Sequence, residues 1–196
     1  TNEPKRNPLQ DLFHWSRVFF SLFVLCFALA VTFRSLFDGK TTMWAAVPSG
    51  AAVVLFLGLM SVVGLLEGMQ IAFFAVAKYR EEDRGSSPVA RKVCSILFDG
   101  DGHNLPGFMV GRQMTVTLCF FVIARVTTLN VVPGEGDNVF GVSDGMQEFF
   151  NLGFLGAIIT TILASIAWQL VAGAFPIAFL SSPLVLVFLR IALAIE

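Results

Sequence analysis

The chain has 196 residues, of which 56% are hydrophobic and 14% are charged, and its formal net charge at pH 7 is −1. Soluble domains carry about 25% charged residues, so this composition predicts an integral membrane protein embedded in a lipid bilayer. The lack of a net positive charge argues against a nucleic-acid partner, whose phosphates need basic side chains to neutralise them. The three cysteines are far apart in the sequence, so they indicate neither a disulfide framework nor a zinc site.

Several long apolar segments follow one another along the chain. A helix needs about 20 apolar residues to cross the hydrocarbon core of a bilayer. The pattern therefore predicts an all-α, polytopic membrane protein, with a single transmembrane domain over residues 1–196 and about five spans. The predicted spans are residues 18–36, 44–66, 108–129, 149–172 and 175–194.

The second predicted span is followed by further apolar residues. A straight helix over residues 44–77 would be about 51 Å long at about 1.5 Å per residue, much longer than a hydrocarbon core of about 30 Å. We therefore expect a break near Glu67 and Gly68. The segment after the break, residues 71–77, would either re-enter the membrane or lie along its surface.

The connections between spans indicate the orientation of the chain. The longest one, residues 78–106, contains a segment at residues 89–98 that could form a short amphipathic helix at the membrane surface. Five spans place the termini on opposite sides, with nine Lys and Arg residues on the N-terminal side and four on the other. Since cytoplasmic loops are enriched in these residues, we expect a cytoplasmic N-terminus.

Two polar clusters lie beside the second and third predicted spans. Charged and amide side chains at membrane depth are costly and commonly mark a site or a pathway. Glu67 and Gln70 share one helix face, Gly68 allows a close backbone approach, and Arg112 and Gln113 open the third span. Together these groups could hold a small polyhydroxylated solute. Alternatively, the two charged residues lie at the membrane interface and end their helices.

A similar cluster precedes the fourth span. The sequence DGMQ at residues 144–147 repeats the acid, glycine, methionine and glutamine of EGMQ at residues 67–70. This repeat is either a coincidence, or Asp144 and Gln147 present a similar site from the opposite face of the membrane. Neither a nucleophile elbow nor a phosphate-binding loop is present in the sequence, so we expect no enzymatic activity.

The motifs EGMQ at residues 67–70 and GRQ at residues 111–113 resemble the EGxQ and GRQ motifs of the silicon transporter family of silicifying algae. The resemblance extends from about Val62 to the C-terminus. Typical members look like two five-span halves, each with both motifs, whereas this chain has one pair of motifs. It is therefore similar to the short silicon-transporter-like members or to one half of a long member.

The resemblance implies sodium-coupled symport of silicic acid, with no cofactor other than the sodium ion. It also implies a multi-pass protein of the plasma membrane. A half-length chain would need a partner, so we expect a homodimer; inverted halves favour an antiparallel dimer, and the charge bias favours a parallel one. The ion would bind at Glu67. The residues expected around silicic acid are Gln70, Arg112, Gln113, Gly68 and Gly111.

Two functions of other classes fit the same sequence. A cation channel or divalent-cation transporter would use Glu67 and Asp144 as a ring of carboxylates. A non-transporting structural subunit would need a larger complex and would move no solute alone.

Overall fold

The computed structural model describes residues 8–80, 87–98 and 104–195, and every regular element within these ranges is a helix. This arrangement confirms the predicted all-α fold. The α-helices are α1 (Pro8–Phe37), α2 (Ser49–Val76), α3 (Pro88–Phe98), α4 (Asn104–Thr127), α5 (Asp144–Asn151), α6 (Phe154–Ile159), α7 (Ala167–Ala174), α8 (Pro176–Leu180) and α9 (Pro183–Ile195). A short 3₁₀ turn, η2 (Val139–Gly141), precedes α5, and a π-helical segment, η3 (Thr160–Ile166), joins α6 to α7.

In the described part of the chain, four helices are long and apolar enough to cross a membrane: Pro8–Phe37, Ser49–Val76, Asn104–Thr127 and Phe154–Ala174. The last of these is α6, η3 and α7 in continuous succession. They correspond to the first four predicted spans, and they confirm a polytopic membrane protein. The helix α1 begins at Pro8 rather than near residue 18, because the polar residues before the apolar run continue the same helix.

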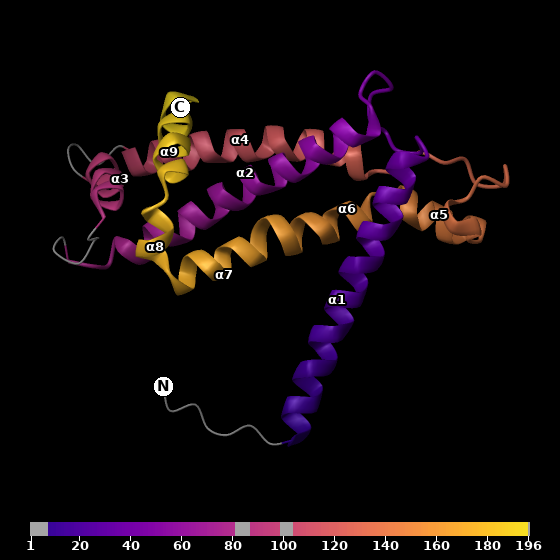
Figure 1. The fold of residues 1–196 in the computed structure, drawn as a ribbon, viewed down its shortest axis with the longest axis horizontal. Helices are drawn as coiled ribbons and strands as arrows, with labels where there is room; N and C mark the ends of the chain where they lie inside the picture. Colours follow the sequence, from indigo (N-terminus) through magenta and orange to yellow (C-terminus); the bar gives the residue numbers. More distant parts are fainter. Residues whose placement is uncertain (1–7, 81–86, 99–103, 196) are drawn as a thin grey trace.

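The fifth predicted span consists of two short helices, α8 and α9. Proline is tolerated in the first turn of a helix but not in its interior, and Pro176 and Pro183 each begin one of these helices. The 13 residues of α9 extend about 20 Å at about 1.5 Å per residue, which is less than the thickness of a bilayer core. Figure 1 shows α8 and α9 running across the long helices rather than alongside them.

The predicted break in the second span is wrong. The helix α2 is continuous from Ser49 to Val76, so Glu67 and Gly68 lie inside it and residues 71–76 extend it. The Phe179 ring packs directly against Gly68, and a Cβ at this position would come within 2.6 Å of the ring. The final turns of α2 are held by aromatic contact, with the rings of Phe73 and Phe108 4.9 Å apart.

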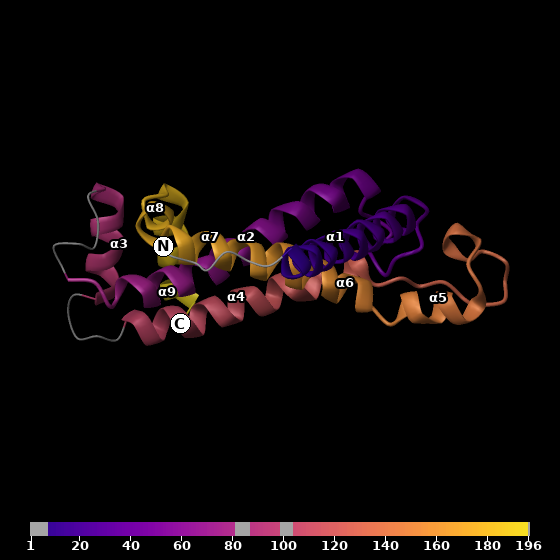
Figure 2. The same ribbon diagram turned by 90° about the horizontal axis from the view of Figure 1, so that it is seen from below.

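The long helices α2, α4 and α6–α7 lie side by side in both views of the ribbon (Figures 1 and 2). The helix α2 packs against α4, α7 and η3. Fully buried side chains of α2, such as Phe56, Leu66 and Met69, form the centre of this bundle. In contrast, α1 diverges from the bundle, and its buried residues all lie from Leu25 onwards.

The predicted amphipathic segment is α3, whose Ala90, Val93, Cys94 and Leu97 are buried while Arg91 and Lys92 are exposed. It lies at the end of the bundle where α2 ends and α4 begins (Figure 1). The helices α8 and α9 contact α3, so the C-terminal segment lies at this same end. The opposite end contains α5 and the connection of residues 128–143.

Candidate functional site

The polar clusters of the second and third spans meet in the folded chain. Glu67 lies on α2 and Arg112 lies on the neighbouring α4. The Arg112 Nη1 donates to Glu67 Oε1 across 2.7 Å, and the two side chains are 10% and 17% exposed respectively. A guanidinium and a carboxylate from residues 45 positions apart therefore form a largely buried ion pair.

Two amides extend this ion pair. The Arg112 Nη2 donates to Gln113 Oε1 across 3.1 Å, and the Gln169 Nε2 donates to Glu67 Oε2 across 3.1 Å. Gln169 comes from α7, so three separate helices contribute to the cluster. We call Glu67, Arg112, Gln113 and Gln169 the ion-pair cluster.

The sequence alone did not identify Gln169 as a site residue. Its only signal was an amide inside a largely apolar span, and no motif surrounds it. The helix α7 packs along α2 because Gly64 leaves space for the indole of Trp168. That contact sets Gln169, the next residue, beside Glu67.

One buried polar atom of the ion-pair cluster lacks a partner among the described residues. The Arg112 Nε is buried, and it makes no hydrogen bond with any described residue. An unsatisfied buried donor costs about 1–3 kcal/mol. A hydroxyl oxygen from a solute or a water molecule would remove that cost.

The ion-pair cluster lies well inside the long helices. At about 1.5 Å per residue, Glu67, Arg112 and Gln169 lie between about 5 and 8 Å from the middle of their helices, and a bilayer core extends about 15 Å to each side of its centre. The alternative that the charged residues end their helices is wrong, because α2 continues to Val76 and α4 begins at Asn104.

Three other predicted site residues take different positions. Gln70 lies one turn after Glu67 and is half-buried, and its amide makes no hydrogen bond with any residue in the described ranges. Gly68 and Gly111 are buried packing positions. A Cβ on Gly111 would collide with the backbone carbonyl of Ala192 in α9, as a Cβ on Gly68 would collide with α8.

Asp144 and Gln147 lie at the other end of the bundle and do not join Glu67 (Figure 1). The Asp144 Oδ1 accepts from the Gly134 N–H across 3.1 Å and from Asn138 Nδ2 across 2.8 Å. The fully buried Gln147 accepts from the Val139 N–H across 2.9 Å. Both side chains therefore hold the connection before α5 in place.

A bundle of apolar helices with an ion pair and amides well inside the long helices defines a polytopic membrane protein that has a polar cluster between its spans. Comparison with known protein families assigns a function class to this protein, silicon transport. The chain belongs to the silicon transporter family, because the family model described as silicon transporter matches residues 1–196, the whole chain. This membership indicates a transporter of silicic acid rather than an enzyme. Comparisons with curated proteins and with solved structures give no match.

Proposed function

We propose that the chain is a sodium-coupled symporter of silicic acid and that the ion-pair cluster is its transport site. The observation that supports this proposal most is the ion pair of Glu67 and Arg112, which lies well inside the long helices and is hydrogen-bonded to two amides. A charged pair in a bilayer is retained when it serves a site or a pathway. The unpartnered Arg112 Nε adds a donor that a solute can use.

Silicic acid suits this set of groups. It is mostly neutral near pH 7, and each of its four hydroxyls both donates and accepts hydrogen bonds. The Arg112 Nε would donate to one hydroxyl oxygen, while the amides of Gln113 and Gln70 have both a donor and an acceptor for the others. Gln70 is available for this role since its amide has no partner among the described residues.

Sodium coupling follows from competition for Glu67. In the structure Arg112 neutralises this carboxylate. A sodium ion bound to Glu67, with Gln169 holding the second oxygen, would replace that positive charge and release the guanidinium toward the solute. Solute binding would then be stronger when sodium is bound, and a coupling free energy of this kind is reciprocal.

We also propose a homodimer in the plasma membrane, with the N-terminus in the cytoplasm. The end of the bundle at α3 carries Lys78, Arg80, Arg91 and Lys92, and the opposite end carries Arg34, Lys40 and Arg125. This difference supports a cytoplasmic α3 by the positive-inside rule. Crosslinking the chain in native membranes tests the dimer, and a product at twice the mass of the chain is expected; a monomer alone would contradict it.

The proposed function is tested by reconstituting the purified chain into liposomes and measuring silicic acid uptake. We expect uptake that accelerates when sodium is higher outside than inside. Uptake that does not respond to the gradient would rule out symport. No uptake at all would favour a structural subunit.

A cation channel is supported less well, because Glu67 is paired with Arg112 and Asp144 lies at the other end of the bundle. If the chain were such a channel, the same liposomes would conduct cations without silicic acid. Replacing Glu67 and Asp144 by asparagine would abolish that current.

A further inference from the structure

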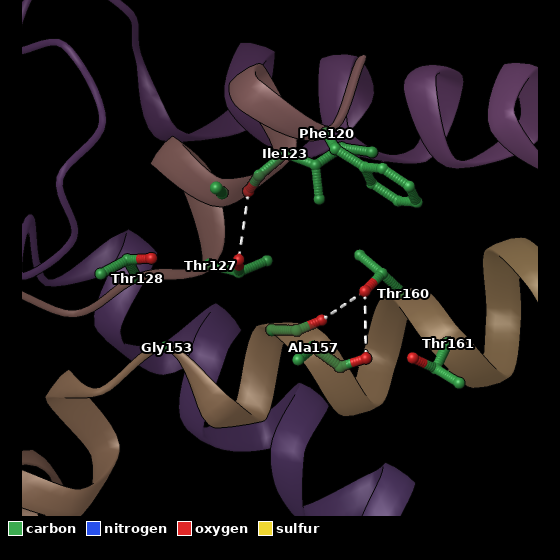
Figure 3. Close-up of a pocket in the computed structure, with 10 residues that line it drawn as sticks. Phe120, Ile123, Thr127, Thr128, Gly153, Ala157, Thr160 and Thr161 are labelled. Carbon is green, nitrogen blue, oxygen red and sulfur yellow. Dashed lines mark hydrogen bonds between the residues drawn. The ribbon is translucent and has the colours of Figure 1, made fainter. Parts of the chain in front are cut away.

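A cavity whose mostly apolar lining includes four threonines lies far from the ion-pair cluster. It occupies about 370 Å³ between the last two turns of α4 and the first turns of α6 and η3. Figure 3 shows Thr127 and Thr128 on one wall, and Thr160 and Thr161 on the other. We call this cavity, whose ten lining residues include these four, the threonine cavity.

The close approach of two helices forms one end of the threonine cavity. A Cβ on Gly156 would overlap the Thr127 side chain, so the absence of a side chain at Gly156 lets α6 approach α4 there. Beyond this contact the wall is η3, a π-helical segment. π-Helical turns are rare and occur frequently at functional sites.

The hydroxyls of the threonine cavity are of two kinds. The Thr127 hydroxyl donates to the Ile123 carbonyl across 3.2 Å, and the Thr160 hydroxyl lies 3.0 Å from the carbonyls of Gly156 and Ala157 (Figure 3). These two hydroxyls keep oxygen lone pairs for an incoming donor. The hydroxyls of Thr128 and Thr161 make no hydrogen bond with any residue that the structure describes, so they can both donate and accept.

The uncharged lining of the cavity favours a neutral ligand over an ion. None of the ten described residues that line the cavity is charged. An ion without a countercharge loses its hydration at high cost, whereas a neutral solute with several hydroxyls exchanges one set of hydrogen bonds for another. The volume has space for such a solute with several waters, since a water takes about 30 Å³ in the liquid.

The threonine cavity and the ion-pair cluster use the same helices at different depths. From Thr127 to Arg112 the distance along α4 is about 22 Å, and from Thr160 to Gln169 it is about 14 Å, at about 1.5 Å per residue. The threonine cavity therefore lies near the ends of α4 and α6 that face away from α3. Phe120 and Ile123 line it on α4, and they separate its hydroxyls from the charged residues.

We propose that the threonine cavity is a separate binding site for a small neutral polyhydroxylated solute, entered from the side of the membrane opposite α3. This inference rests on the proposed function for the identity of that solute, which is silicic acid. The solute binds to the hydroxyls of Thr128 and Thr161, and Phe120 lies between this site and the ion-pair cluster along α4.

Uptake kinetics test this site. The isosteric change Thr161→Val should raise the KM for silicic acid between about twofold and tenfold, the range that one neutral hydrogen bond supplies, and should leave kcat nearly unchanged. The matched control is Thr117→Val. This exposed threonine of α4 donates to the Gln113 carbonyl and lies outside the cavity. Equal KM values in wild type and Thr161→Val would overturn the proposal.

A binding experiment separates this proposal from the proposed function. With the three native cysteines replaced by alanine, Thr161→Cys should react with a membrane-impermeant thiol reagent, and silicic acid should slow the reaction. Ser143→Cys, in the exposed connection before α5, should react at the same rate with and without silicic acid. Protection without any uptake would sink the transport function but support the site. Uptake without protection, or protection by sodium ions alone, would overturn the site.

Discussion

The guanidinium of Arg112 donates to a carboxylate and to an amide, and keeps its Nε free of any partner in the described residues. Because the side chain is only 10% exposed, its charge depends on Glu67 for compensation. Gln169 in turn depends on Glu67 as an acceptor. If the proposed transport site is right, folding and solute binding rely on the same residues, and variants must separate the two.

Removing one partner of the ion pair should destabilise the chain. Glu67→Gln leaves the Arg112 charge buried without a counterion, and breaking a buried pair in this way costs about 3–5 kcal/mol. The double variant Glu67→Gln with Arg112→Gln should recover much of this loss. Thermal unfolding of the purified protein in detergent measures the stability of the single and the double variant. Additive losses in the double variant would show that the residues do not interact.

Removing the amide of Gln169 should weaken ion binding. Gln169→Leu takes away the donor to Glu67 Oε2, and a hydrogen bond to a charged group contributes about 1.5–3 kcal/mol. The sodium concentration that gives half-maximal uptake should therefore rise by at least about tenfold. The neighbouring exposed residue supplies a control, Leu170→Ala. An unchanged sodium dependence in Gln169→Leu would exclude the proposed role.

The sequence predicted part of this site. Glu67 and Arg112 were identified because charged residues in apolar spans are rare, and the structure brings them together. Gln169 could not be found, since its position beside Glu67 depends on how α7 packs along α2. The roles of Gln70, Gly68 and Gly111 in solute binding stay predictions, because the structure places Gln70 nearby and uses both glycines for helix contacts.

At the scale of the helices, small residues determine which elements touch. Gly64 and Gly68 allow α7 and α8 to approach α2, and Gly111 allows α9 to cross α4. The predicted break in α2 failed for this reason: of the two uses expected for Gly68, a helix break and a close approach of another element, the structure shows only the approach, inside a continuous helix. The fifth span was predicted as one helix, whereas the structure shows two pieces that begin at Pro176 and Pro183.

Gly111→Ala should separate α9 from α4. The new methyl group would meet the Ala192 backbone, which cannot rotate away, and overpacking of this kind costs about 1–3 kcal/mol. Gly58→Ala, on a surface of α2 with nothing nearby, should instead stabilise the helix by about 0.5–1 kcal/mol. The shift in unfolding temperature distinguishes them. Equal shifts in the two variants would contradict the close contact at Gly111.

At the scale of the whole molecule, the arrangement changes the expected topology. Four crossing helices return the chain to the side of the membrane on which it started, and α8 and α9 stay at the end of the bundle that holds α3 (Figure 1). We therefore predict both termini on the same side of the membrane, in place of the opposite sides that five full spans would give.

Epitope tags at the two ends of the chain test this topology. Both tags should be accessible to antibodies from the same side of sealed vesicles, together with a cysteine introduced at Ser95 in α3. A cysteine at Ser143 should be labelled only from the other side. Tags accessible from opposite sides would show that α8 and α9 complete a fifth crossing.

The most direct test of the transport site compares stability and uptake in one protein, the double variant Glu67→Gln with Arg112→Gln. Its initial rate of sodium-driven silicic acid uptake is measured in liposomes beside its unfolding temperature. We predict that stability recovers relative to Glu67→Gln, whereas uptake stays at least about tenfold below wild type and loses its sodium dependence. Normal, sodium-dependent uptake by a folded double variant would contradict the assignment.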